Sequence, residues 1–127
     1  MEPDVVFYAQ SKLDIDAIEQ VGYFCNTSFI LTYFNLTSED YCKFITISRE
    51  QFAEFVNDLN IEIIHHNVRH NEEPWNNKLK QVSIFSHHSI HYDESYWKSI
   101  NDVYNWAAEV LNKFHWSTDE IAIYCFL

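Results

Sequence analysis

The segment IAIYCFL, residues 121–127, decides the fold class that we expect for this chain. Its residues are apolar at consecutive positions, whereas a strand with one face in water alternates apolar and polar residues. We therefore expect a central strand of a β-sheet, covered on both faces. Just before it, residues 100–114 carry apolar side chains at helical spacing and predict a long helix that starts at Ser95 or Ser99.

Two helices are predicted closer to the N-terminus. Ser11, followed three residues later by Asp14, resembles a helix N-cap, and Gly22 is a plausible end for that helix. Ser48 and Gln51 form a capping-box pattern before a second helix. Its predicted apolar stripe is Phe52, Phe55, Val56 and Leu59.

Short segments rich in β-branched and aromatic residues predict the other strands. Residues 5–8 are the first of them, and residues 28–36 and 43–47 are expected to pair through a turn at 37–40. Residues 61–66 and 81–92 flank Asn76-Asn77, which suggests a second hairpin.

The predicted fold class is therefore α+β, with a mixed or antiparallel sheet packed against about three helices. A chain of 127 residues without a Pro/Gly/Ser-rich linker fits one domain over residues 1–127.

Acidic residues outnumber basic ones by nineteen to eight, which gives a formal net charge of −11. Such a field attracts basic partners and repels phosphate backbones, so we expect neither a nucleic acid nor a membrane as the direct partner. Ten Phe, eight Tyr and four Trp argue against a disordered acidic chain. With no signal-like or membrane-spanning stretch, we expect a cytoplasmic protein.

Catalytic and cofactor motifs are missing from the sequence. The single glycine, Gly22, excludes a Gly-rich phosphate loop and a G-x-S-x-G nucleophile elbow. Cys25, Cys42 and Cys125 form no C-x-x-C pair and are expected to be reduced and mostly buried. We therefore predict a protein that is not an enzyme and needs no cofactor.

Histidines supply the strongest alternative from another class of function. They gather at positions 65, 66 and 70 and at 87, 88 and 91. If the second hairpin forms, His66 and His87 become neighbours and could ligate a metal, as in a His-dependent metalloenzyme. Neither group contains H-E-x-x-H, so partly exposed histidines without a metal are the favoured interpretation.

Carboxylates and aromatic residues supply the candidate binding site. Glu50, Glu54 and Asp58 recur every four residues and form one column on the second helix. This column is either a docking face for a basic partner or a face that only aids solubility. The full set of predicted partner-binding residues is Asp14, Asp16, Glu19, Glu50, Glu54, Asp58, Trp75 and Trp97.

In overall character the chain resembles the small acidic immunity proteins of bacterial contact-dependent and polymorphic toxin systems. Barstar-like inhibitors share an acidic helix and end in a helix followed by an apolar strand, as residues 99–114 and 121–127 do here. The resemblance implies an intracellular inhibitor of a basic protein such as a nuclease toxin. The other possibility among binding proteins is a nucleic-acid mimic that occupies a DNA-binding cleft.

Overall fold

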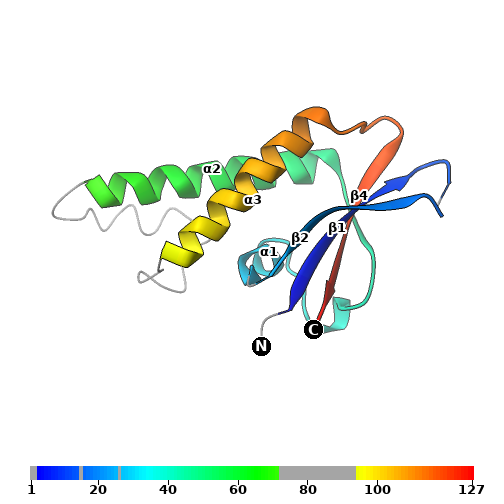
Figure 1. Cartoon of the computed structure of the whole chain (residues 1–127), viewed down its shortest axis with the longest axis horizontal. Helices are drawn as coiled ribbons and strands as arrows, with labels where there is room; N and C mark the ends of the chain where they lie inside the picture. Colours follow the sequence, from blue (N-terminus) through cyan, green and yellow to red (C-terminus); the bar gives the residue numbers. More distant parts are fainter. Residues whose placement is uncertain (1–2, 15, 26, 72–93) are drawn as a thin grey trace.

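A computed structural model describes residues 3–14, 16–25, 27–71 and 94–127. In chain order the elements are β1 (Asp4–Ser11), β2 (Ile18–Phe24), α1 (Ser28–Tyr33), the 3₁₀ helix η1 (Ser38–Asp40), β3 (Ile45–Ile47), α2 (Arg49–Asn71), α3 (Glu94–Lys113) and β4 (Asp119–Phe126). The chain therefore has the predicted α+β fold, with one sheet and three α-helices in the described residues (Figure 1).

The sheet has four antiparallel strands in the order β2-β1-β4-β3. Phe7 of β1 and Ile45 of β3 both pair with Ile123 of β4. β4 is therefore a central strand, as its continuous apolar sequence predicts, and Ile121, Ala122 and Ile123 are all buried.

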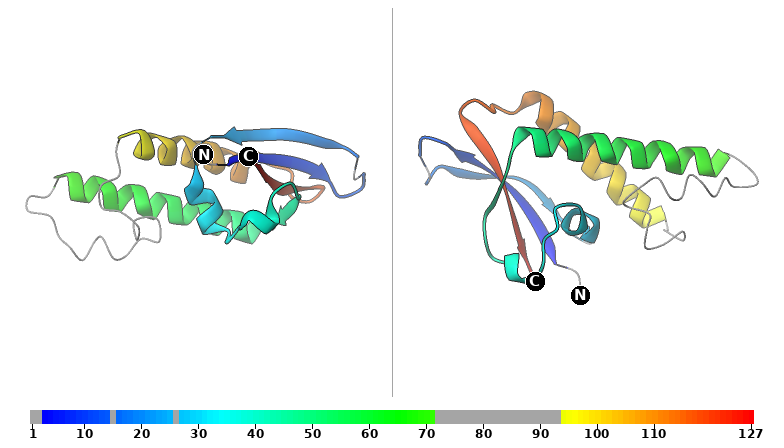
Figure 2. Two further views of the ribbon diagram at one scale, coloured as in Figure 1. Left: turned by 90° about the horizontal axis from the view of Figure 1, so that it is seen from below. Right: turned by 180° about the vertical axis from the view of Figure 1, so that it is seen from behind.

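Helices α2 and α3 lie side by side on one face of the sheet (Figures 1 and 2). Phe7 points into this layer, and its ring centroid is 6.4 Å from that of Phe52 on α2 and 4.8 Å from that of Trp106 on α3. Alternation along a strand sends every second side chain to the same face. Val5 and Phe7 therefore belong to the core, whereas Val6 and Tyr8 lie on the opposite face.

The predicted capping box at the start of α2 is confirmed. The backbone N–H of Gln51 donates to Ser48 Oγ at 3.1 Å, and the backbone N–H of Ser48 donates to Gln51 Oε1 at 2.9 Å. The predicted apolar stripe follows, with Phe52, Phe55 and Leu59 fully buried. These bonds satisfy donors that the first helical turn leaves without a partner.

The predicted helix over residues 11–22 is wrong, because this segment is the turn and second strand of a hairpin. Ser11 Oγ accepts from the backbone N–H groups of Leu13 and Asp14, at 3.2 and 3.3 Å. Asp14 Oδ1 accepts from the N–H of Asp16 at 3.0 Å. Ser and Asp stabilise turns with the same local bonds that they make in helix caps, so the pattern fits both structures.

Residues 28–36 were expected to form a strand but contain α1. Phe29, Ile30 and Leu31 are consecutive and all buried, and a short helix with apolar neighbours on several sides buries such a run as completely as a central strand does. The turn expected at 37–40 contains η1. The strand expected at 43–47 is shorter, and it pairs with β4 instead of with residues 28–36.

Residues 61–66 were expected to form a strand but continue α2, which runs to Asn71. Phe52, Phe55, Leu59 and Glu62 are all fully buried and recur at intervals of three or four residues. The helical pattern of buried residues thus continues through residues 61–66, although their β-branched side chains predicted a strand. The partner strand at 81–92 and the turn at Asn76-Asn77 lie outside the described residues.

Candidate functional site

The predicted acidic residues lie in two places. Asp14, Asp16 and Glu19 belong to the β1–β2 hairpin, where all three are exposed, and not to a helix. Glu50, Glu54 and Asp58 lie on α2 as predicted, with the first two exposed and Asp58 half-buried. The column of carboxylates on α2 therefore exists, and its environment changes along its length.

Asp58 is held by a tyrosine that the sequence did not single out. The hydroxyl of Tyr33, the last residue of α1, donates to Asp58 Oδ2 at 2.7 Å. Burial, and then the hydrogen bond to Asp58, raise the pKa of Tyr33 above its ordinary value. The phenol therefore stays protonated at neutral pH and fixes the position of the carboxylate.

A groove opens between α1 and α2 around this pair. It has a volume of about 400 Å³ and is lined by Tyr33, Phe34, Asn35, Gln51, Glu54 and Asp58. The ring centroids of Tyr33 and Phe34 lie 5.1 and 5.0 Å from that of Phe55, so both rings pack against a buried core residue. The groove thus combines two carboxylates with two supported aromatic rings, which suits a cationic side chain.

Glu50 has different surroundings from Glu54. It lines a separate depression together with Lys12 and Arg49, and Asp119 and Glu120 lie at the same place. Basic and acidic side chains are mixed there, so the local charge is more balanced than in the α1–α2 groove. Of the predicted column, Glu54 and Asp58 therefore form the more strongly acidic end.

The described surface does not support a partner-binding role for either of the two predicted aromatic anchors, Trp75 and Trp97. Trp97 is only 7% exposed and belongs to the core under α3, so its proposed surface role is wrong. The 3.6-residue period of the helix turns this position inward, beside Ile100. Trp75 lies outside the described residues.

The histidine hypothesis gains no support from the described part of the chain. His65 and His66 are on α2 and not on the predicted hairpin strand, and His87 lies outside the described residues. Among the described residues, no group of three or more His, Cys, Asp or Glu could hold a metal ion.

Two of the three thiols are more exposed than the sequence predicted. Cys25 and Cys42 are exposed, and only Cys125 is buried, while all three are free of disulfide bonds. Burial raises the pKa of the Cys125 thiol to about 11, and Asp40 adds to this effect. A thiol with such a pKa is a poor nucleophile at neutral pH, so Cys125 has a packing role.

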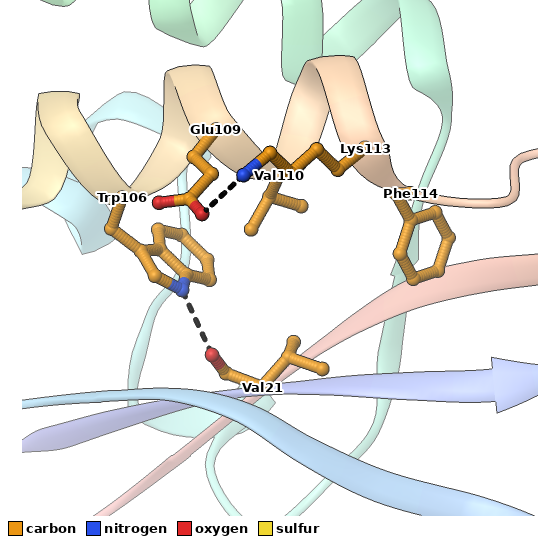
Figure 3. Close-up of a pocket in the computed structure, with 6 residues that line it drawn as sticks. All are labelled: Val21, Trp106, Glu109, Val110, Lys113 and Phe114. Atoms are coloured by element: carbon orange, nitrogen blue, oxygen red, sulfur yellow. Dashed lines mark hydrogen bonds and ion pairs between the residues drawn. The ribbon is translucent and has the colours of Figure 1, made fainter.

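A second groove, mainly apolar, runs between β2 and α3 (Figure 3). Its lining residues are Val21, Trp106, Glu109, Val110, Lys113 and Phe114, and its volume is about 370 Å³. Glu109 and Lys113 form an ion pair of 3.0 Å beside it. The indole N–H of Trp106 donates to the carbonyl of Val21 at 2.8 Å, so this tryptophan ties α3 to β2.

Comparisons with protein-family models, with curated proteins and with solved structures find no match to this chain. Among the described residues, no helix has both the length and the apolar character needed to cross a membrane. The case for a function therefore rests on the geometry and charge of the surface.

Proposed function

We propose that this protein binds and neutralises a basic protein partner in the cytoplasm, as an immunity-type inhibitor of a toxin such as a nuclease. The observation that supports the proposal best is the α1–α2 groove, where Glu54 and Asp58 face the rings of Tyr33 and Phe34. The net charge of −11 would attract such a partner over a distance before contact.

The groove would receive a lysine or arginine side chain of the partner. Its ammonium or guanidinium group would pair with the two carboxylates, while the aromatic rings contact its carbon stem or its charged plane. Tyr33 already holds Asp58 in place through its hydroxyl group. Because this acceptor is fixed before binding, less side-chain entropy is lost when the partner arrives.

The hairpin carboxylates Asp14, Asp16 and Glu19 would contribute mainly to attraction at a distance. All three are exposed, and charges at the rim of an interface act chiefly on the association rate and on its dependence on salt. An inhibitor of this kind would act by covering the active site or the substrate entrance of its partner.

The test begins with isolation of the partner. We would purify the tagged protein from its native cells, identify a co-purifying basic protein, and measure its affinity with both components purified. We expect an affinity that falls as NaCl is raised, and a loss of at least about tenfold for Glu54→Lys. A partner that is not basic, or an affinity independent of salt, would contradict the proposal.

A matched control separates the groove from the general charge. Asp102 is an exposed carboxylate on α3, outside the groove, so Asp102→Lys makes the same change in net charge as Glu54→Lys. We expect Asp102→Lys to weaken binding by less than about threefold. Equal losses for both variants would mean that the total charge, and not the groove, recognises the partner.

A further inference from the structure

The face of the sheet that α2 and α3 leave uncovered carries a continuous cluster of aromatic side chains. The cluster, here called the aromatic face, consists of Tyr8, Tyr23, Phe44, Tyr124 and Phe126. Neighbouring ring centroids are 4.9 Å apart for Phe44 and Tyr124, 5.4 Å for Tyr8 and Phe44, and 6.2 Å for both Tyr124–Phe126 and Tyr23–Phe126.

Strand register explains why these rings gather. Val6 pairs with Tyr23 on one side and Tyr124 on the other, and Tyr8 pairs with Ala122. Residues directly opposite each other in an antiparallel pair share a face, so the large rings flank two small residues. Val6 and Ala122 are 2% and 0% exposed, whereas Phe44 is 54% and Tyr23 is 44% exposed.

Charge is almost absent from the middle of this face, although the chain carries nineteen acidic residues. Asp4 pairs with Phe126 at one end of the strands, and Glu120 pairs with Gln10 at the other. The hydroxyl of Tyr23 donates to Asp4, so even this polar contact lies at an end. A basic protein would therefore find few carboxylates between these two ends.

An uncharged aromatic surface is complementary to another surface of the same kind. Aromatic pairs attract beyond the area that they bury, and two sheets pack face to face in many proteins. In a negatively charged protein, the neutral face is also where two copies can approach with the least like-charge repulsion. We propose that the aromatic face is a homodimer interface, on which a second copy of this chain packs with its own aromatic face.

The size of the aromatic face indicates how tightly the two copies are expected to bind. The eight residues of β1 extend over about 26 Å, and four strands span about 19 Å. Because β3 has only three residues, such a footprint buries at most about 1,000 Å² over both copies, which is below the range of stable interfaces and typical of weak, transient ones. The dimer is therefore a weak and reversible one, with a dissociation constant in the range of about 10 to 500 µM.

Sedimentation velocity of the purified full chain, from about 1 µM to about 1 mM, tests this interface. We expect a monomer–dimer equilibrium that becomes tighter as NaCl is raised, because salt screens the repulsion between two negatively charged copies. Binding to a basic partner has the opposite dependence on salt. A chain that stays monomeric over the whole range would overturn the proposal.

Substitutions test whether the dimer forms through the aromatic face. Phe44→Glu and Gln20→Glu each add a carboxylate to the face, because Gln20 pairs with Tyr8 and is exposed. Gln20→Glu does so almost without a change of shape. Both should raise the dissociation constant at least about tenfold. Ile64→Glu is the control, because Ile64 is a similarly exposed apolar residue, 49% against 54%, on α2.

If Ile64→Glu weakens the dimer as much as Phe44→Glu does, the aromatic face is not the interface. Circular dichroism establishes that each variant is folded. Should Phe44→Glu fail to fold, Gln20→Glu and Ile64→Glu still decide the question, since both positions lie on the surface.

Discussion

Gly22 and Trp106 are matched to each other across the contact between β2 and α3. A Cβ atom added at Gly22 would lie 2.6 Å from Cζ2 and 2.8 Å from Cε2 of the indole. The indole is held by its hydrogen bond to Val21 and by ring contacts with Phe7, Phe24 and Phe52. The single glycine of the chain therefore serves close packing and not a turn.

We expect Gly22→Ala to lower the free energy of unfolding by about 1 to 3 kcal/mol, because the held indole must move. Urea denaturation measures the loss. In the background of Trp106→Leu the same substitution should cost much less, since the obstructing ring is gone. Equal costs in the two backgrounds would show that the contact with Trp106 does not restrict the side chain at position 22.

Cys125 links stability to alkaline pH. Burial holds its pKa at about 11 in the fold, against 9.0 for an ordinary thiol. Below pH 9 the thiol is protonated in both the folded and the unfolded chain. Between pH 9 and 11 only the unfolded chain releases the proton, so stability falls with rising pH. Urea denaturation over this interval should show a smaller decline for Cys125→Ala than for the natural chain, and equal slopes would contradict this explanation.

At the scale of elements, α2 depends on its first turn. Ser48→Ala removes the acceptor for the N–H of Gln51 and should cost about 1 kcal/mol of stability. Ser28→Ala is the control, because Ser28 is an exposed first residue of α1, whose start has no side-chain cap bond. Thermal or urea unfolding should show a change within about 0.5 kcal/mol for the control. A similar loss for both would indicate a general effect of serine removal.

Elements with a strong local pattern were predicted well. The capping box of α2, the long helical spacing in α3 and the continuous apolar run of β4 each lie within one segment. The hairpin at residues 11–24 and the helix α1 were not predicted, because Ser, Asp and apolar residues fit more than one local structure there. Pairing of β2 with β1, and burial of α1, are settled by neighbours that are distant in sequence.

At the scale of the whole molecule, the net charge of −11 opposes compaction. The ion pair Lys113–Glu109 is exposed on α3, so solvent screens it and it offsets little of this repulsion. We expect the free energy of unfolding to rise by on the order of 1 kcal/mol between about 10 and about 150 mM NaCl, as salt screens the repulsion between carboxylates. Urea titrations at each salt concentration measure the change, and a fall in stability would mean that attractive pairs dominate.

The sequence predicted only part of the candidate site. The carboxylates of α2 could be predicted from their four-residue spacing, but the groove needs Tyr33, which is 25 residues from Asp58. In the sequence, the aromatic face is indicated only by aromatic residues at the alternate positions 124 and 126. This alternation predicts a cluster only once the strand register places Tyr8 and Phe44 beside these residues.

Sequence alone determined the α+β class, the acidic field, the central strand and the start of α2, because each depends on composition or on neighbours within about four residues. Only the tertiary structure decided the hairpin, the α1–α2 groove, the contact of Trp106 with β2 across 85 residues, and the aromatic face. These features depend on which segments meet in space, and that choice is made by burial summed over the whole chain.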